Sequence, residues 1–420
     1  MNDSRVQAST QKLLELLEEL AAFTAPGLGV TRLLYTEEWG RAQTFLQGKM
    51  AGFGLKVTTD KVGNVFGRLM GRSPEQKVIL TGSHIDTVVN GGKYDGAYGI
   101  AAAMIALQDL QKNFGQPQRT LEVVSFCEEE GSRFPLAYWG SGHVTERYDG
   151  SEAENCMDAD RISLQAAMAA FSFSQSVTDT DGNISKSTGA RNDIDAFVEL
   201  HIEQGIILET TDTQIGVVQG IVGQRRYMVK VSGVANHAGT TPMLMRQDAL
   251  ASAVEMLYVL EGAAKAAGAP LVATSGKLEV YPNTPNVIPG EVLFALDIRH
   301  SEEEELECFC AKILSLYHEI AAERGVTLEV IPVLHTLPAP MDTKLSTALE
   351  EICLEQGKTY RMMVSGAGHD AQLFAPRCPT AMIFVPSRAG ISHSPEEYSS
   401  PEQLAAGLEV LTAMLYELAY

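Results

Sequence analysis

The chain has 420 residues, of which 45% are hydrophobic and 20% are charged, as in globular proteins large enough for more than one domain. Its formal net charge of -21 argues against a surface that binds nucleic acid, because the phosphates would be repelled. We expect a cytoplasmic protein, because the amino terminus lacks a secretory signal pattern, no apolar run could span a bilayer, and the six cysteines are scattered without paired spacing.

Strands and helices are predicted to alternate along the first part of the chain: a helix over 5–23, strands over 55–58, 65–69 and 78–81, a buried helix over 99–110, and strands over 121–127 and 196–205. This alternation favours an α/β sheet with catalytic groups at the strand ends. The polar stretch 174–192 interrupts the pattern and is predicted to be an exposed loop.

The pattern changes near residue 215. A strand over 226–232, a helix over 247–267, strands over 276–281 and 291–298, and a helix starting at Ser301 predict a compact α+β insert. From Pro340 the α/β pattern resumes. We therefore expect a catalytic domain split into residues 1–212 and 332–420, with an inserted domain over 213–331.

A histidine and two carboxylates follow the apolar run that starts at Val78. His84 and Asp86 end the run, and a glycine-rich loop brings Asp95 back eleven residues after the histidine. Imidazole and carboxylate at a strand end suit a divalent transition metal, with Asp86 accepting the free ring N–H of His84. A histidine simply hydrogen-bonded to a neighbouring aspartate is the alternative interpretation of this segment.

Three further segments carry groups of the same chemistry. Glu128, Glu129 and Glu130 follow the strand 121–127, His201 interrupts an apolar strand, and His393 lies in a loop of small residues. Taken singly, these could be a surface acidic run, a core histidine and a loop histidine. Together with His84 and Asp95 they can supply two metal ions that hold a water between them, and one glutamate can take a proton from that water.

Nine motifs stand in order along nearly the whole chain: Gly82-Ser-His-Ile-Asp86, Gly92-Lys-Tyr-Asp-Gly96, Glu128-Glu-Glu-Gly-Ser-Arg-Phe134, His201-Ile-Glu-Gln-Gly205, Asn236-His-Ala-Gly-Thr-Thr-Pro-Met243, Asn286-Val-Ile-Pro-Gly290, Asp297-Ile-Arg-His300, Ser365-Gly-Ala-Gly-His-Asp370 and Ile391-Ser-His-Ser-Pro395. The set resembles the M20-type metallohydrolases, in particular the branch that hydrolyses ureido and carbamoyl amides. The resemblance implies a metallopeptidase-like α/β catalytic domain with a mixed sheet flanked by helices, and an inserted α+β domain that serves as lid and dimerisation domain.

The resemblance also implies a role for each metal ligand. His84 and His201 would hold one ion, Glu130 and His393 the other, and Asp95 would bridge the two. The ions would be Zn²⁺ or Mn²⁺, since histidine and carboxylate sites accept both. Glu129 would be the general base, although the three consecutive glutamates alone do not distinguish it from Glu130.

Substrate-side residues follow from the same resemblance. His237 would polarise the scissile carbonyl, often from the partner subunit of a homodimer, with a turn histidine as the alternative. Arg299 and Asn286 resemble residues that grip the carboxylate and ureido groups of a substrate, and a guanidinium matches a carboxylate with two parallel N–H groups. Three further positions are weaker candidates for substrate contacts and could equally be structural: Gln204, Arg226 and Gly368.

The implied reaction is hydrolysis of a ureido C–N bond in a small carboxylate. The leading substrate is allantoate, which would give ureidoglycine or ureidoglycolate with ammonia and CO₂ in purine catabolism. An N-carbamoyl-L-amino acid hydrolase or a β-ureidopropionase is the alternative. A metallo-exopeptidase and a non-enzymatic metal-binding protein are less favoured, because the substrate-side motifs and the base Glu129 are present.

Overall fold

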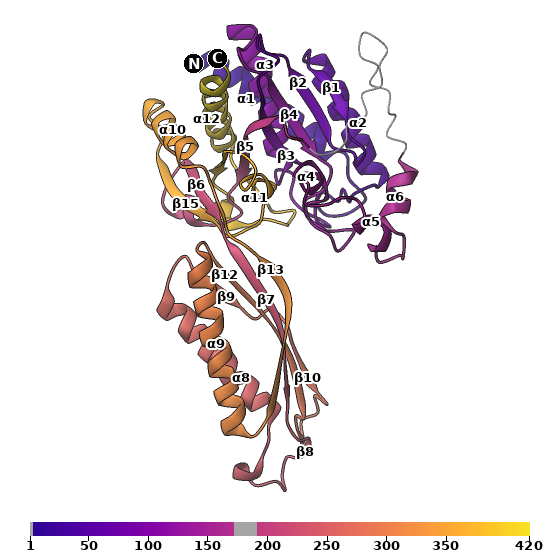
Figure 1. Ribbon diagram of the computed structural model, residues 1–420, viewed down its shortest axis with the longest axis vertical. Coiled ribbons are helices and arrows are strands. Elements are labelled where there is room, and N and C mark those ends of the chain that lie inside the picture. The colour runs from indigo at the N-terminus through magenta and orange to yellow at the C-terminus, as the bar shows by residue number, and fades with distance from the viewer. Residues whose placement is uncertain (1–2, 172–190) are drawn as a thin grey trace. The chain divides into compact units, whose positions relative to one another are not determined.

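The computed structural model describes residues 3–171 and 191–420, and the chain divides into two compact units (Figure 1). One unit comprises residues 1–219 and 341–420, and the other comprises residues 220–340. These boundaries fall later than the expected 213 and 331, because β6 (Ile215–Ile221) pairs with β16 (Thr380–Val385) in the first unit's sheet, and β13 (Thr327–Thr336) still belongs to the second unit's sheet. The polar stretch expected to be a loop, 174–192, lies outside the described residues apart from its last two.

The first unit is built on a nine-stranded sheet in the order β1-β2-β4-β3-β5-β16-β6-β14, with β15 pairing to β6. Its remaining strands are β1 (Lys56–Thr59), β2 (Val65–Leu69), β3 (Val78–His84), β4 (Leu121–Phe126), β5 (Ile194–Ile202), β14 (Ala339–Pro340) and β15 (Tyr360–Ser365). The four neighbours β4, β3, β5 and β16 are parallel, whereas β1, β2 and β6 pair antiparallel. The predicted mixed α/β sheet is therefore confirmed.

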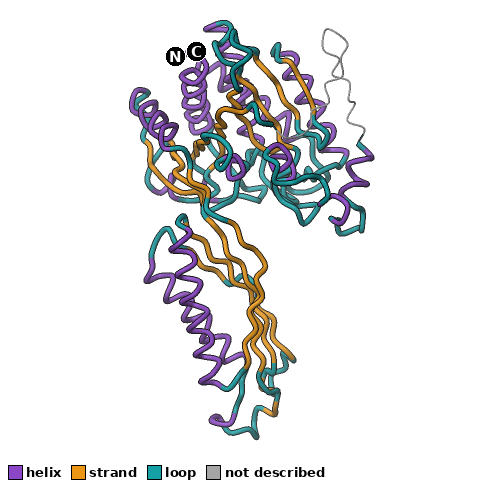
Figure 2. Tube along the Cα trace, in the orientation of Figure 1, coloured by secondary structure: helices purple, strands orange, loops and turns teal. Residues whose placement is uncertain are grey.

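Helices connect the strands of this sheet and flank it (Figure 2). They are α1 (Asp3–Ala21), α2 (Glu37–Gly52), α3 (Ala97–Phe114), α4 (Trp139–Val144), α5 (Glu152–Asn155), α6 (Leu164–Ala170), α7 (Ile207–Thr210), α10 (Thr343–Glu355), α11 (Ala371–Phe374) and α12 (Pro401–Ala419), with a 3₁₀ turn at Arg388–Gly390.

Alternate residues of β5 show that the sheet is covered on both faces. Val198 and Leu200 belong to one large apolar core together with α1, α3 and α12. Side chains alternate along a strand, so Phe197 points to the opposite face, where its ring stacks 4.3 Å from that of Phe374 in α11. Strands buried on both faces need continuous apolar sequence. The unbroken apolar start of β3 is the sequence signature of such a strand, and all seven of its residues are buried.

The second unit has a five-stranded antiparallel sheet in the order β10-β12-β7-β13, with β9 pairing to β12. Its further elements are β7 (Gly223–Ser232), β8 (Asn236–His237), a 3₁₀ turn (Met243–Met245), α8 (Ala249–Ala267), β9 (Val272–Thr274), β10 (Leu278–Tyr281), β11 (Val287–Ile288), β12 (Glu291–His300) and α9 (Glu303–Arg324). The two long helices lie along one side of the strands in Figure 2.

Strict alternation in β12 explains this two-layer arrangement. Val292, Phe294, Leu296 and Ile298 are buried among side chains of α8 and α9, while the residues between them are only partly buried. The predicted α+β insert thus has both expected helices and all three expected strands, which are β7, β10 and β12. The strands β8, β9, β11 and β13 escaped prediction, since the first three are short and β13 carries Pro332 and exposed apolar residues.

Among the helices of residues 3–171 and 191–420, none combines the length and the apolar character required to cross a bilayer.

Candidate metal centre

The carboxyl ends of the four parallel strands carry the predicted metal-binding side chains. His84 is the last residue of β3, and His201 is the last but one of β5. Residues 128–130 follow β4, and His393 lies in the loop after β16. Because neighbouring parallel strands end at one edge of a sheet, these four segments meet there.

Gly96 lets the Asp95 loop approach the end of β3. Its φ is +63°, and a Cβ at this position would lie 2.4 Å from the carbonyl oxygen of His84 and 2.6 Å from its ring. Only glycine adopts this conformation without strain and leaves room for the ring. The glycine of the Gly-Lys-Tyr-Asp-Gly motif therefore places the Asp95 carboxylate against His84.

The two carboxylate oxygens of Asp95 face two different groups of donors. Oδ1 lies 3.4 Å from Nε2 of His84 and 3.2 Å from Nε2 of His201. Oδ2 lies 3.4 Å from Nε2 of His393, which is also 3.4 Å from Oε1 of Glu130. In each group of three, the ligand atoms lie within 4.8 Å of one another, and Asp95 belongs to both groups. The structure thus brings together all five predicted ligands in an arrangement that one bridging carboxylate can serve.

Backbone acceptors fix which ring nitrogen of the buried histidines carries the proton. Nδ1 of His201 lies 2.9 Å from the carbonyl oxygen of Ile202, and Nδ1 of His84 lies 3.1 Å from that of Asp86. A ring N–H directed at a carbonyl leaves the lone pair on Nε2. In both histidines Nε2 is the nitrogen that faces Asp95, as a metal ligand requires.

Glu129 and Glu130 occupy different places at the centre. Glu130 lies next to His393, whereas Glu129 is buried and has a carboxylate oxygen within 4.8 Å of ligand atoms of His84 and Glu130. Burial, with Coulombic repulsion by Glu130, raises the pKa of Glu129 well above its usual value, against the opposing effect of His84. A carboxylate with a raised pKa beside the ligands is suited to accept a proton.

Asp86 holds the segment that carries both glutamates. Its Oδ1 accepts the backbone N–H of Glu129 at 2.9 Å and its Oδ2 accepts that of Glu130 at 3.2 Å. The expected contact with His84 is present, but the Asp86 carbonyl oxygen, at 3.1 Å, is nearer to Nδ1 than the carboxylate, at 3.3 Å. The Asp86 carboxylate therefore positions the glutamates as well as the ring.

Asp86→Asn is expected to weaken metal binding and turnover. Asparagine offers one oxygen, so its amide group would face one of the two glutamate N–H groups and leave that donor without a partner. We expect metal affinity to fall by about 10- to 100-fold, as for other residues that orient ligands. Titration of Zn²⁺ into metal-stripped protein measures this, with exposed Asp160→Asn as control. Unchanged affinity in Asp86→Asn would contradict the positioning role.

The charge of the centre fits divalent cations. Seven acidic side chains in and behind it are buried: Asp86, Asp95, Glu128, Glu129, Glu199, Asp370 and Glu397. Among the described residues, none of the seven pairs with a lysine or arginine, and their only ion-pair partners are histidines. Burial, reinforced by Asp95, also raises the pKa of the adjacent Glu130 to about 7. Buried carboxylates without a cation are costly, and bound divalent ions would compensate this charge.

Glu199 and His369 also lie at the centre, and neither was assigned a role from the sequence. Glu199 accepts hydrogen bonds from the Ser83 hydroxyl at 2.7 Å and the Ala371 N–H at 2.9 Å. His369 lies 2.9 Å from the Ser365 hydroxyl, and its ring centre is 4.6 Å from that of His201. The sequence could have predicted a place for Glu199 at the centre. It stands two residues before His201 in the same strand, so the two side chains point to the same face of the sheet.

Two weaker candidates lie in the first unit. Gln204 donates its amide N–H to Oδ2 of Asp95 at 2.8 Å, and its Oε1 is buried without a hydrogen-bond partner among the described residues. Its amide therefore contacts a predicted metal ligand. A Cβ at Gly368 would lie 1.8 Å from the hydroxyl of Tyr138, so this glycine makes room for a phenol whose pKa is raised well above its usual value by burial and by Glu129.

Within the second unit, Arg226 and Arg299 converge on Asp297. Oδ2 of Asp297 accepts from Nη2 of Arg226 at 2.8 Å, and Oδ1 accepts from Nε of Arg299 at 2.8 Å. Burial would raise the pKa of Asp297, but the hydrogen bonds from Arg299 and Arg226 outweigh it and hold this pKa below its usual value. The aspartate fixes the direction of two guanidinium groups, which suits recognition of a carboxylate.

His237 and Asn286 lie beyond the opposite end of the five-stranded sheet, where β8 and β11 form a separate two-stranded sheet. His237 is the last residue of β8 and pairs with Val287 of β11, while Asn286 directly precedes β11 and its carbonyl accepts the Ala238 N–H at 3.0 Å. Nδ1 of His237 accepts the Gly239 N–H at 3.1 Å, so the ring proton is on Nε2. The stretch of β7 from Arg226 to Ser232, before the chain reaches His237, already spans about 20 Å. The predicted pair Arg299 and Asn286 is thus not brought together within one chain.

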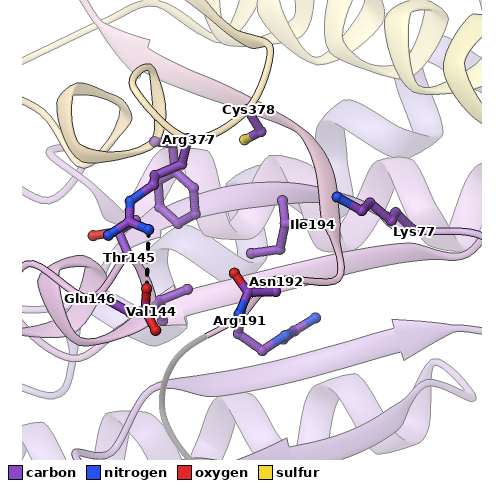
Figure 3. Close-up of a pocket in the computed structure, with 10 residues that line it drawn as sticks. Lys77, Val144, Thr145, Glu146, Arg191, Asn192, Ile194, Arg377 and Cys378 are labelled. Carbon is purple, nitrogen blue, oxygen red and sulfur yellow. Dashed lines mark hydrogen bonds and ion pairs between the residues drawn. The ribbon is translucent and has the colours of Figure 1, made fainter.

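A separate cavity of about 140 Å³ opens near the amino ends of β3, β5 and β16, away from the strand ends that carry the predicted metal ligands. Figure 3 shows its Arg377 joined to Glu146, with Cys378 nearby. Arg191, also in its lining, pairs with Asp193 and Glu122. Burial raises the pKa of the Cys378 thiol. With both arginines paired and the thiol protonated, this cavity lacks the chemistry of the metal centre.

Comparison with known proteins extends over nearly the whole chain. Residues 80–417 match the model of peptidase family M20/M25/M40. The chain is 47% identical to an allantoate amidohydrolase of Bacillus subtilis, over 99% of this chain and 98% of the relative, and 44% identical to one of Escherichia coli, over 98% of each. A crystal structure of an amidase of the hydantoinase/carbamoylase family from Burkholderia multivorans superimposes with a TM-score of 0.91 at 33% identity, over 98% of each chain.

Proposed function

The chain belongs to peptidase family M20/M25/M40, and from this premise we propose that it is a metal-dependent amidohydrolase that cleaves a ureido C–N bond of allantoate. The observation that supports this most strongly is Asp95, whose two oxygens face two separate donor groups. The similarity to two allantoate amidohydrolases selects the substrate. The products would be ammonia, CO₂ and ureidoglycine, and ureidoglycine would itself break down to ureidoglycolate. The role would be in purine catabolism.

Two divalent ions, Zn²⁺ or Mn²⁺, would polarise the ureido carbonyl and lower the pKa of the attacking water. His84 and His201 would bind one ion, Glu130 and His393 the other, and the Asp95 carboxylate would be shared. Glu129 takes a proton from the water as it attacks the carbonyl carbon. Protonated Glu129 then delivers that proton to the leaving nitrogen as the C–N bond breaks.

The substrate carboxylate would be bound by guanidinium groups of the second unit. Asp297 orients Arg226 and Arg299, and each guanidinium presents N–H groups in the planar arrangement that matches a carboxylate. His237, with its ring proton on Nε2, can donate to the developing oxyanion, and Asn286 lies beside it to bind an amide.

The opposite positions of these groups support a homodimer. A small ureido carboxylate cannot reach across about 20 Å of strand, so Arg299 and His237 of one chain cannot hold the same molecule. We propose that the partner's His237 completes the site. Exposed apolar side chains of Val254 and Tyr258 on α8 and of Val272 on the edge strand β9 would supply the contact between subunits.

Mixed dimers of two inactive variants are expected to regain activity. In a dimer of Glu129→Gln with His237→Ala, the subunit with intact Glu129 receives the partner's intact His237. Random mixing gives half heterodimers with one working site each, so about one quarter of wild-type activity is expected. Co-expression with two affinity tags and an assay of ammonia release measures it. Separately expressed variants mixed without subunit exchange are the control, and no recovery in purified heterodimers would show that His237 acts in its own subunit.

A substrate panel tests the reaction itself. With Mn²⁺ or Zn²⁺ added, ammonia release is expected from allantoate, with much lower kcat/KM for N-carbamoyl-L-amino acids and N-carbamoyl-β-alanine. The reverse order would favour an N-carbamoyl-L-amino acid hydrolase or a β-ureidopropionase. The similarity to an amidase of the hydantoinase/carbamoylase family is the reason to test this alternative. Dipeptides test the exopeptidase alternative.

A reducing, cytoplasmic location is also proposed. All six cysteines are free, so Cys308 and Cys310 do not form a disulfide. Most cytoplasmic proteins lack disulfides because the reducing cytoplasm keeps their thiols reduced.

A further inference from the structure

Glu397 is a buried carboxylate behind the metal centre, and the proposed mechanism gives it no task. It lies between the loop of His393 and helix α12, and only 5% of its surface is exposed. Among the described residues it forms no ion pair with a lysine or arginine. It does not cap α12 either, since the capping box of that helix is made by Ser400 and Gln403. A charged side chain held in this way needs another reason to be there.

All side-chain hydrogen bonds of Glu397 go to the two loops that carry metal ligands. Oε1 accepts the backbone N–H groups of Tyr94 at 3.0 Å and Asp95 at 3.2 Å. Oε2 accepts the hydroxyl of Ser392, at 3.0 Å. The carboxylate is packed so closely on the first loop that a Cβ at Gly92 would lie 2.0 Å from Oε1. Glu397 therefore ties the backbone of one ligand, Asp95, to the residue that precedes another.

Ser392 extends this connection to the bridging carboxylate. Its hydroxyl lies 3.1 Å from Oδ2 of Asp95 as well as 3.0 Å from Glu397, and it accepts the Gln204 amide N–H at 3.3 Å. A hydroxyl has a single proton to donate, so it serves one of the two carboxylates at a time. Oδ2 is the oxygen that faces His393, whereas Oδ1 faces His84 and His201. Through Ser392, Glu397 is thus linked to the half of the centre that contains Oδ2 of Asp95 and His393.

We propose that Glu397 is a positioning residue for the ion bound between Asp95 Oδ2, His393 and Glu130, acting through Ser392 and the backbone of Asp95. The inference rests on the proposed two-ion function and deepens it. Residues that orient ligands in this way change metal affinity by about 10- to 100-fold when they are removed. The effect should fall on one ion, because the contacts of His84 and His201 with Oδ1 do not involve Glu397.

The test is titration of Zn²⁺ into the metal-stripped full-length protein, with separate affinities fitted for two ions. In Glu397→Ala we expect one affinity to fall about 10- to 100-fold, with the other within threefold of wild type. Glu397→Gln keeps an oxygen for the two N–H groups and should recover most of the loss. Glu396→Gln, at the exposed neighbouring position, is the matched control and should bind both ions as wild type does.

Ser392→Ala removes the hydroxyl that links the two carboxylates. This second variant tests the proposal even if the Glu397→Ala protein does not fold. It should weaken the same ion, and the double variant Glu397→Ala/Ser392→Ala should lose little more than Glu397→Ala alone, since the two residues act in series. With allantoate, kcat should fall and KM should change little. Unchanged affinities with only a lower Tm, or an equal loss at both ions, would overturn the proposal. Selective metal loss in a protein that hydrolyses no ureido substrate would uphold it and refute the proposed reaction.

Discussion

Glu129→Gln is expected to lower kcat for allantoate by about 10²- to 10⁴-fold, the usual contribution of a general acid–base group. Glutamine preserves the shape of the side chain and the backbone hydrogen bond from residue 129 to Asp86, but it cannot take a proton from water. Because Glu129 is not assigned as a ligand, both metal affinities should stay within a few fold of wild type. Single-turnover kinetics on fully metal-loaded protein measures the effect without interference from product release.

Glu130→Gln is the matched comparison for this variant. The carboxylate of Glu130 lies 3.4 Å from His393 and is assigned to an ion, so its replacement should weaken metal binding and should be partly rescued by excess Zn²⁺. Glu129→Gln should not be rescued. If rescue by metal is found for Glu129→Gln instead, the two glutamates have exchanged roles.

Asp95→Asn is expected to have the second large effect, the loss of tight binding of both ions and of nearly all activity. The asparagine side chain retains only one oxygen, so one of the two ions would lose the ligand that they share. The amide nitrogen of the asparagine would face either the two histidines at the Oδ1 position or the Gln204 N–H at the Oδ2 position. We expect affinity to fall by more than the roughly 100-fold seen when outer residues are changed. Metal content after dialysis against a chelator, measured by mass spectrometry, gives the result.

Asp160→Asn serves again as the control for a lost surface charge, and its metal content should equal that of wild type. Removal of both ions from wild-type protein by EDTA should abolish ammonia release, and Mn²⁺ or Zn²⁺ should restore it. Activity that survives complete chelation would refute the metal-dependent reaction.

The sequence predicted the strands that carry the centre because buried parallel strands have a simple pattern. The apolar run from Val78 to Leu80 begins a strand that ends at His84. Because this strand is buried on both faces, its sequence has the continuous apolar character typical of a central parallel strand. Asp95 could be linked to His84 because a short glycine-rich loop cannot carry it far. The M20/M25/M40 family itself followed from the order of motifs, and the family match over residues 80–417 confirms it.

Groups that depend on the arrangement of distant segments could not be predicted in the same way. Glu397 approaches Asp95 from a position about 300 residues later in the chain, and no local periodicity reports the pairing of β16 with β5 that brings it there. Arg299 and Asn286 stand only thirteen positions apart in sequence, yet β12 separates them along its length. The family resemblance assigned both residues to one substrate, whereas the extended strand β12, ten residues long, separates them along its length.

The most direct test of a centre bridged by Asp95 is anomalous X-ray scattering from crystals of the Mn²⁺- or Zn²⁺-loaded protein. Two peaks are expected about 3.5–4 Å apart, one bound by His84 and His201 and the other by Glu130 and His393, each with one oxygen of Asp95. A single peak, or two peaks that do not share Asp95, would contradict the two-ion centre from which the proposed reaction follows.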